Sequence, residues 1–473
     1  MFFLNPSISI TCFCTLISIT SAAVSRIIYK DVAILGGGAS GSHAAVRLRE
    51  DFNKSIIIID RQENLGGHVE TYTDPVTGNP YDYGVNSYTE YGKAREFFAR
   101  FNVSLVNPTS LKLNTSYIDF TSGKLLPGYL SPVSADVTAA LIRYLDVTSK
   151  YEDMVIPSYE RFPEDVPDEL LTRFSDIVIK YNLQACLPLI YQITGFGLGN
   201  MADELFLFVM SEFSAPMARV VLGQKNSWVP STRRNQDLYD NIAEFLDGDV
   251  LYSTTVVKST RTSKGVELLV RNTAGESHKI IAKRLLISFA LTPENTATLS
   301  LSSAEKEIFS KWKLSHGYCG IVTSPALSPN ISLINLPASA APQNYLSFPS
   351  APFVVRYQYL GDTNFRILIT GTENFTLPLA RTLAQETFQT LISAGNIPQI
   401  EGGDLDFEAF QEHTTTKQFI PIEDVKNGFY RKLYALQGER STWYTGRAWS
   451  GQFTTILWEF NDIWLLPRLL DSL

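Results

Sequence analysis

The first clear pattern in the chain spans residues 31–60, DVAILGGGASGSHAAVRLREDFNKSIIIID. Two short apolar runs, 32–35 and 55–59, have the length and composition of strands buried in a parallel sheet. Between them, from Ala39 on, small and apolar residues recur at the spacing of the buried face of a helix. The pattern therefore predicts a strand–helix–strand unit.

The turn between the first strand and the helix carries Gly36, Gly38 and Gly41 in the arrangement G-x-G-x-x-G. The first glycine allows the tight turn, the second lets a pyrophosphate approach the backbone, and the third lets the helix pack closely. The helix N-terminus directs free N–H groups at the phosphates. Asp60, at the end of the second strand, suits a ribose hydroxyl. The unit is predicted to bind a dinucleotide through Gly36, Gly38, Ala39, Ser40, Gly41, Asp60 and Arg61.

Two later regions have patterns that fit further parts of the same sheet. An amphipathic helix precedes apolar or alternating strands at 250–257, 266–270 and 284–290. Near the C-terminus a strand ends at Tyr444, Gly446 interrupts it, and a helix begins near Phe453.

The residues after Asp60 carry a resemblance to a known family. Leu65-Gly66-Gly67-His68 and Thr71 resemble the L-G-G-R-x-x-[ST] element of the flavin-dependent amine oxidase superfamily. The longer stretch LGGHVETYTDPVTGNPYDYGV is most similar to the fungal flavoproteins typified by β-cyclopiazonate dehydrogenase. The resemblance implies FAD as the cofactor, with Gly66 and Gly67 passing its pyrophosphate. His68 stands where the superfamily usually has arginine, which implies a weaker or proton-dependent phosphate contact, a space-filling role or a link to the flavin.

The resemblance continues in the two later regions. It implies that Val256 or Val257 contacts the adenine and that residues 288–293, SFALTP, form a loop over the flavin. Trp449-Ser450-Gly451 is similar to the W-S-G of monoamine oxidases, which implies a position beside the flavin for the residues that follow. The dipole of the last helix would stabilise negative charge on the pyrimidine ring. The cofactor contacts implied here are Gly66, Gly67, His68, Val256, Val257, Gly446, Phe453 and Thr454.

The expected fold class is α/β, a Rossmann-type FAD-binding domain of the glutathione-reductase or amine-oxidase type interleaved with an α+β substrate-binding domain. The FAD-binding domain is expected in three parts, 28–110, 215–300 and 413–473. The two inserts, 111–214 and 301–412, are expected to form the substrate domain. Within them, 187–200 is interpreted as a helix with a glycine loop and 352–361 as a strand.

The expected activity is that of an FAD-dependent oxidoreductase, which removes hydride from a small organic substrate in secondary-metabolite biosynthesis and passes electrons to oxygen or another acceptor. An amine or polyamine oxidase is the alternative. Gln452 replaces one of the two aromatic residues typical of amine oxidases, and residues 314–324 offer Tyr318 and Cys319 instead of the usual lysine. A non-catalytic carrier related to guanine-nucleotide dissociation inhibitors and a redox-neutral flavin isomerase are also considered. No catalytic residue is assigned, and the pocket candidates, for which ordinary packing is an equal alternative, are Asn86, Tyr88, Tyr318 and Gln452.

Composition and termini add a cellular context. The net charge of −8 gives no reason to expect a nucleic-acid or anionic-membrane partner. Residues 1–23 are predicted to be a secretory signal peptide, and the competing interpretation is an uncleaved anchor. After it, Cys186 and Cys319 could pair or be buried singly, and no metal-type spacing links them to the histidines. A secreted or vesicular glycoprotein is expected, with sequons at Asn53, Asn102, Asn114, Asn330 and Asn374.

Overall fold

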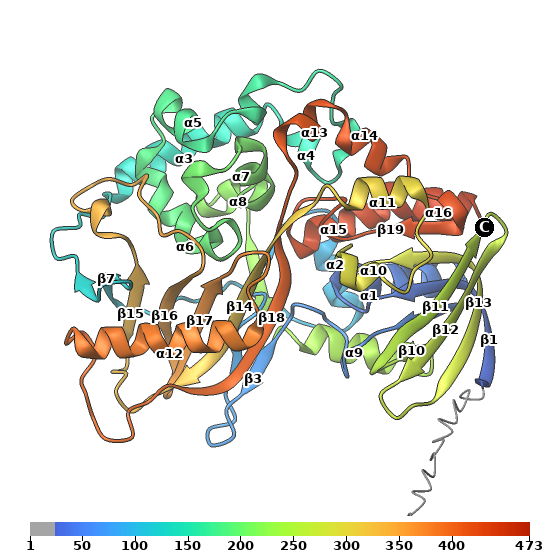
Figure 1. Ribbon diagram of the computed structural model, residues 1–473, viewed down its shortest axis with the longest axis horizontal. Helices are drawn as coiled ribbons and strands as arrows, with labels where there is room; N and C mark the ends of the chain where they lie inside the picture. Colours follow the sequence, from blue (N-terminus) through green and yellow to red (C-terminus); the bar gives the residue numbers. More distant parts are fainter. Residues whose placement is uncertain (1–23) are drawn as a thin grey trace, which may run out of the picture.

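The computed structural model describes residues 24–473, apart from the side chains of residues 414–417. The predicted signal peptide, with Cys12 and Cys14, lies outside the described residues. Two large mixed sheets, each associated with helices, stand side by side (Figure 1). The chain passes between the two sheets several times, so that each is assembled from segments far apart in sequence.

The first sheet has the order β10-β2-β1-β13-β12-β11, and β19 also pairs with β13. β1 runs parallel to β2 and β13, β19 runs parallel to β13, and β11 and β12 form an antiparallel extension. The four isoleucines of β2 are all buried, as expected for a strand covered on both faces. The strands are β1 (Val24–Leu35), β2 (Ile56–Ile59), β10 (Val250–Leu251), β11 (Thr254–Thr262), β12 (Gly265–Asn272), β13 (Ser277–Ile287) and β19 (Thr442–Tyr444).

The helices of this domain bring two distant parts of the chain together. Trp458 Nε1 donates to the carbonyl of Ala39 at 3.0 Å, and Asn461 Nδ2 donates to that of Ser40 at 2.9 Å. These bonds fix the C-terminal helical segment against the first turn of α1. The helices are α1 (Ala39–Val46), α2 (Ala94–Arg100), α9 (Asp237–Leu246), α10 (Pro293–Thr296), α11 (Ser303–Phe309), α13 (Ile422–Lys426), α14 (Phe429–Tyr434), α15 (Thr454–Phe460) and α16 (Leu466–Asp471).

The second sheet has the order β18-β14-β17-β16-β15-β7-β8. The long helix α12 (Leu377–Ser393) crosses one face (Figure 1), where Tyr357, Phe388 and their neighbours form a separate apolar core. The helix α6 (Leu187–Leu198) packs on β17 and β18. The strands are β7 (Asn114–Asp119), β8 (Lys124–Leu125), β14 (Lys313–Thr323), β15 (Ile331–Asn335), β16 (Phe353–Gly361), β17 (Asn364–Thr370) and β18 (Asp406–Phe419).

Apart from the 15-residue helix α3 (Ser134–Thr148), the remaining elements are short. There are two small sheets among the described residues, one formed by β3 and β4 and the other by β5, β9 and β6. Their bounds are β3 (Thr71–Thr73), β4 (Pro80–Asp82), β5 (Tyr88–Thr89), β6 (Leu105–Val106) and β9 (Ser227–Pro230). The further helices are α3 (Ser134–Thr148), α4 (Glu152–Val155), α5 (Phe174–Tyr181), α7 (Phe206–Glu212) and α8 (Ala215–Val221).

Two sequence expectations about boundaries were wrong. The strand expected at 250–257 is divided into β10 and β11, because Ser253 adopts a left-handed φ of 47° between them. The expected boundary between 412 and 413 falls inside β18, which continues in the substrate-domain sheet to Phe419 because it pairs with β14 over that length.

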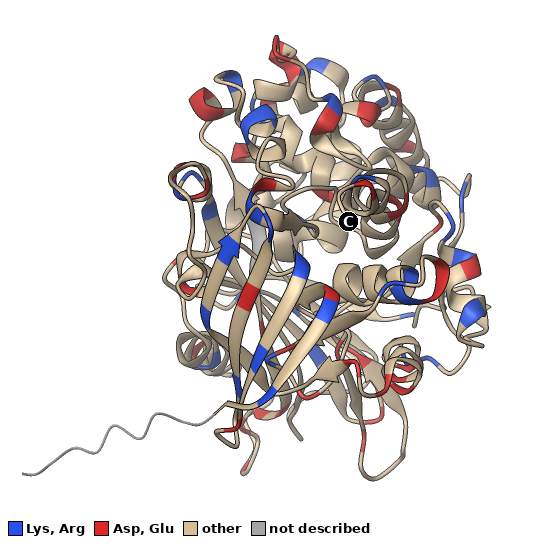
Figure 2. Cartoon of the chain, turned by 90° about the vertical axis from the view of Figure 1, so that its right-hand side faces the viewer, with Lys and Arg blue, Asp and Glu red and all other residues tan. Residues whose placement is uncertain are grey.

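The described residues also show the state of the two cysteines, the distribution of charge and whether a helix could span a membrane. Cys186 and Cys319 are both free and buried, so the single-burial interpretation holds. On the side of the molecule drawn in Figure 2, both signs of charge are present on helices and strands alike. Between residues 24 and 473 no helix has the length and apolar character needed to cross a bilayer.

Candidate active site

Two glycine-rich turns meet at the carboxyl end of β1. Gly36, Gly66 and Gly67 have left-handed φ values of 98°, 120° and 62°, which glycine adopts without strain. The amide of Gly66 donates to the carbonyl of Gly37 at 3.0 Å, so the second turn is held against the first. A Cβ on Gly67 would lie 2.9 Å from Cα of Gly38. The backbones of the two glycine turns therefore lie close enough to form a cradle for a pyrophosphate. A side chain on Gly67 would occupy the space of that cradle.

The third glycine lies where three strand ends converge. A Cβ on Gly41 would lie 2.0 Å from the carbonyl oxygen of Gly36. Ser288, at the end of β13, donates from Oγ to the carbonyls of Gly36 at 2.7 Å and Leu35 at 3.0 Å. Gly446, just beyond β19, has a φ of 101° and faces the carbonyl of Ser288. The loop expected over the flavin thus fastens the first turn of the cradle.

The N-termini of α1 and α15 lie beside this cradle. Gly38 and Phe453 are their N-cap residues, and neither N-terminus has a side-chain cap. Ser40 Oγ, in the first turn of α1, is buried without a hydrogen-bond partner. Buried polar atoms are normally paired, so this hydroxyl indicates a ligand contact. Open glycine turns, free N–H groups and an unpaired hydroxyl fit a bound dinucleotide.

Asp60 is 7% exposed at the end of β2. Its carboxylate accepts hydrogen bonds from the amides of Gly37 and Gln62. Burial raises the pKa of this carboxyl, and the two amides oppose the rise. Asp60 therefore supports the glycine turn as well as being available to a ribose. Of the other expected contacts, Arg61 is exposed, Val256 is half-buried and Val257 is 38% exposed.

His68 joins the cofactor loop to the substrate domain. Its ring stacks on that of His413, from β18, with centroids 4.4 Å apart and planes 11° apart. The His68 side chain is accessible, yet desolvation by the surrounding protein, followed by the charge of Arg447, lowers its pKa to about 4. From these two facts we infer that His68 lines an internal hollow rather than the outer surface. The hollow lies between the two domains.

We expect the His68 ring to remain neutral at physiological pH. A pKa of about 4 means that it gains its proton only on acidification well below the 6.5 of an unperturbed histidine. In a histidine-labelled sample, its NMR resonances should stay constant from pH 8 to pH 6, and His68→Asn identifies them by their loss. A midpoint near 6.5 would contradict this environment and would restore a proton-dependent phosphate contact.

The opposite wall of the hollow is formed by strands of the second sheet. Cys319 Sγ, on β14, lies 3.2 Å from Nε2 of His413. Arg366, on β17, donates to the amide oxygen of Asn86 and, at 2.7 Å, to that of Gln358. The Asn86 side chain is itself accessible. The structure thus brings Asn86, one of the sequence candidates, to the boundary between the domains.

Gln452 faces a different part of the boundary. It lines a cavity of about 20 Å³ together with Ser211, Glu212 and Arg447. Arg447 donates to the Glu212 carboxylate, and the Oε1 atom of Gln452 is buried without a hydrogen-bond partner. A cavity of this size holds a single water molecule. Gln452 is therefore a polar residue of this small cavity, beside the Arg447–Glu212 ion pair.

Two of the sequence candidates are packing residues. Tyr88 is 1% exposed and makes an edge contact with Phe98, at a centroid distance of 4.7 Å, inside the FAD-domain core. Tyr318 is fully buried in the core beneath α12, where its hydroxyl donates to the carbonyl of Phe375. Side chains alternate along β14, so Tyr318 points away from the face that carries Cys319. The expectation that Tyr318 lines the pocket was wrong.

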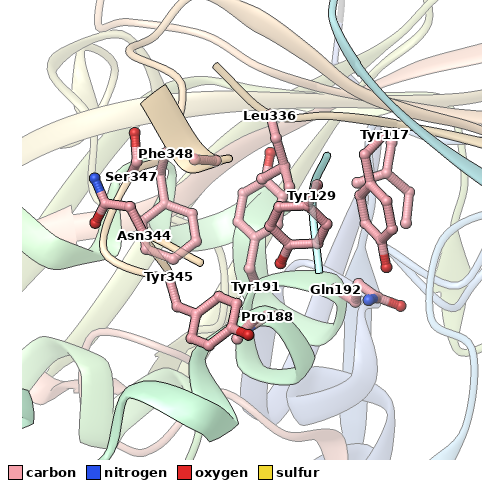
Figure 3. Close-up of a pocket in the computed structure, with 12 residues that line it drawn as sticks. Tyr117, Tyr129, Pro188, Tyr191, Gln192, Leu336, Asn344, Tyr345, Ser347 and Phe348 are labelled. Carbon is pink, nitrogen blue, oxygen red and sulfur yellow. The ribbon is translucent and has the colours of Figure 1, made fainter. Parts of the chain in front are cut away.

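A second recess lies on the substrate domain (Figure 3). Aromatic rings, among them Tyr129, Tyr191 and Phe348, surround a volume of about 10 Å³, which is too small for an organic substrate. The rings anchor the start of α6 against the loop at 338–348. They thereby position the carbonyl of Gln192, which accepts a hydrogen bond from Arg356 at 3.1 Å.

The sequence reasoning missed His413, Arg366 and Arg356. Each lies within an expected or observed strand, and a strand buried on both faces gives no signal about which residues point to a ligand. One signal was available for the arginines. The sequence PFVVRYQYLGDTNFRILIT places a charged residue in each of two apolar strands, and a buried charge requires a partner.

The fold and the cradle together define a flavoprotein of the Rossmann type. Residues 34–101 match the model of the NAD(P)-binding Rossmann-like domain. The chain is 34% identical to the FAD-dependent oxidoreductase pigF of Monascus ruber, over 95% of this chain and 93% of that protein. It is 28% identical to beta-cyclopiazonate dehydrogenase of Aspergillus oryzae, over 92% of each.

Solved structures agree with this fold. The chain resembles a CLA-producing fatty acid isomerase from P. acnes, with a TM-score of 0.69 and 18% identity over 92% of this chain and 99% of that one. It also resembles a putrescine oxidase, with a TM-score of 0.59 and 14% identity over 94% and 99%. The chain belongs to the family of fungal FAD-dependent oxidoreductases that includes beta-cyclopiazonate dehydrogenase. It is an enzyme, its cofactor is FAD, and the carrier alternative is set aside.

Proposed function

We propose that this enzyme oxidises a small organic substrate of fungal secondary metabolism at a C–H bond, with oxygen as the final electron acceptor. Bound FAD supplies the two-electron acceptor for the hydride. The observation that carries the proposal is the stacking of His68, from the cofactor loop, on His413, from the substrate sheet. This contact closes the hollow between the domains on one side, where a substrate can be held against the cofactor and away from water.

We propose distinct tasks for the residues of the two walls. On the cofactor side, Gly36, Gly38 and Gly67 form the cradle, and the free N–H groups of α1 and α15 face negative charge. On the substrate side, Cys319 and His413 form part of the opposite wall of the hollow. Burial raises the pKa of the Cys319 thiol far above its ordinary value, so it serves as a neutral, apolar contact rather than as a nucleophile.

Amine oxidation is the second candidate, because the fold is shared with putrescine oxidase. A cationic amine needs a free carboxylate or an aromatic cage. Of two carboxylates at the domain boundary, Glu212 is paired with Arg447, and Glu70 accepts a hydrogen bond from the neutral hydroxyl of Tyr83 at 2.9 Å. The charged group that faces Asn86 and Gln358 is the guanidinium of Arg366. Its positive charge favours a neutral or anionic substrate.

We further propose that the protein enters the secretory pathway and is glycosylated. The support is the apolar N-terminal sequence together with the exposure of every sequon asparagine. Digestion of the protein from its natural source with an endoglycosidase should lower its mass. A mass equal to that of the unmodified full-length chain would contradict both parts of the proposal. The sequon residues are Asn53, Asn102, Asn114, Asn330 and Asn374.

The proposed activity is tested on the purified holoenzyme by visible absorbance. We expect two flavin absorbance bands, and we expect acid precipitation to release the flavin into the supernatant. The reason is that the His68 ring stacks on His413, which fits a histidine without a covalent bond to the flavin. Under anaerobic conditions, fractions of a fungal metabolite extract should bleach the bands, and air should restore them. Bleaching by putrescine or another simple amine would favour the amine oxidase. Conversion of substrate without bleaching or oxygen uptake would indicate a redox-neutral isomerase.

A further inference from the structure

Two arginines lie on neighbouring strands of the substrate sheet, and one of them, Arg366, reaches the boundary between the domains. Arg366 lies on β17 and Arg356 on β16, where Gln358 is the register partner of Arg366. Arg366 is 7% exposed, and its contact with Asn86 places it at the FAD-binding domain. Arg356 pairs in register with Leu368, two residues from Arg366, so the two arginines are diagonal neighbours. Burial, followed by the charge of Arg366, lowers the pKa of Arg356.

Both guanidiniums have only neutral partners. Arg366 donates to the amide oxygens of Asn86 and Gln358, and Arg356 donates to the carbonyl of Gln192. The Nε atoms of both arginines are buried without a hydrogen-bond partner. In the described part of the chain, no carboxylate lies within ion-pair distance of the guanidinium of Arg356 or Arg366. Asp82 is the acid whose charge acts on Arg366, and its own oxygens are bonded to Thr71 and Asn235.

Two other arginines of the interior, Arg261 and Arg447, are paired with acids. Arg261 lies 2.7 Å from a carboxylate oxygen of Glu305, with both side chains inaccessible, and Arg447 pairs with Glu212. The guanidiniums of Arg261 and Arg447 are thus neutralised by an acid from the chain. Those of Arg356 and Arg366 are not, and two unneutralised positive charges in one interior region are costly. An anion would offset that cost.

We propose that Arg356 and Arg366 form the subsite for an anionic group of the substrate. The group is a planar anion with two oxygens, a carboxylate or the enolate of a 1,3-dicarbonyl compound, because guanidinium donors match that geometry bidentately. Asn86 and Gln358 orient the Arg366 fork and leave its Nε to the ligand. This inference rests on the proposed function, since it identifies the substrate class of the same site. The anionic group of the substrate binds to the two arginines, and the remainder of the substrate extends toward His68.

The subsite is tested by calorimetric titration of the holoenzyme with benzoate, the enolate of cyclohexane-1,3-dione, and neutral benzamide. We expect the wild-type protein to bind an anion and not benzamide. Arg366→Met and Arg356→Met should each weaken that binding by about tenfold or more, the loss of one charge-assisted contact. Arg366→Lys should also weaken it, because lysine keeps the charge and loses the fork. Whichever of the two anions binds more tightly distinguishes carboxylate from enolate.

The matched control is Arg161→Met, which removes the same charge from a side chain that is 74% exposed and should leave anion binding unchanged. Arg366→Met should melt no lower than this control, because it removes an unpaired buried charge. Failure of the wild-type protein to bind either anion, or equal binding by the Arg356→Met/Arg366→Met double variant, would overturn the proposal. Flavin absorbance of the same samples reports the proposed function separately. A flavin-containing protein that binds neither anion would contradict only the anion subsite. A colourless protein that binds benzoate would contradict only the proposed oxidoreductase function.

Discussion

Replacing Gly41 with alanine should yield a protein that does not retain FAD. The new Cβ would lie 2.0 Å from the carbonyl oxygen of Gly36 and 2.6 Å from Ser288 Oγ, so the helix must move away from the strand. Overpacking of this kind costs about 1–3 kcal/mol of folding free energy. The same movement withdraws the helix N–H groups from the pyrophosphate, and a loss of about 1.4 kcal/mol there already weakens binding tenfold. Flavin absorbance per protein and a urea titration measure the two effects.

The matched control for this change is Gly128→Ala. Gly128 lies in an exposed turn, and a Cβ there would meet no atom within 4 Å. We expect this variant to retain FAD and to unfold at the wild-type denaturant concentration. If Gly41→Ala bound FAD as tightly as Gly128→Ala, the close approach of helix and strand would not be needed for the cofactor.

Replacing Glu305 with glutamine should destabilise the whole FAD-binding domain. Its carboxylate accepts from Nη1 of Arg261 at 2.7 Å and Nη2 at 2.8 Å, and from the hydroxyl of Tyr444 on β19. The neutral amide would leave the buried guanidinium of Arg261 without a counter-charge. Breaking one side of a buried pair costs about 3–5 kcal/mol of the free energy of unfolding. Equilibrium denaturation measures the loss.

Glu267→Gln is the control for Glu305, because Glu267 forms an exposed pair with Lys279 at 2.8 Å. Such a pair contributes at most about 1 kcal/mol. The pH dependence gives a further check. Burial raises the pKa of Glu305, but the Arg261 hydrogen bonds outweigh it, so the net pKa is lowered. Its stabilising effect is therefore complete above the ordinary glutamate pKa and is lost as the pH falls toward the folded value. Equal stabilities of the two variants would contradict this role.

The cofactor half of this enzyme is determined by short stretches of sequence. The glycine spacing at 36–41, the acid at Asp60 and the pair Gly66-Gly67 act within about 30 residues, where backbone rules dominate. A left-handed φ at Gly36 and close contact at Gly41 are requirements that only glycine satisfies. The family resemblance, the cofactor and the fold class therefore follow from the sequence, and the comparisons confirm them.

The substrate half was decided by tertiary structure alone. Tyr318 and Cys319 are adjacent in a strand covered on both faces, and a shift of one residue exchanges which of them meets the hollow. The same alternation turns Arg356 and Arg366 away from the core beneath α12, which Tyr357 enters, so that Arg366 meets Asn86 of the FAD-binding domain and Arg356 meets α6. No local pattern fixes that choice, because helices and the other domain cover both faces of the sheet. Only the packing of α12 on one face and of the cofactor domain on the other assigns these side chains to core or to site.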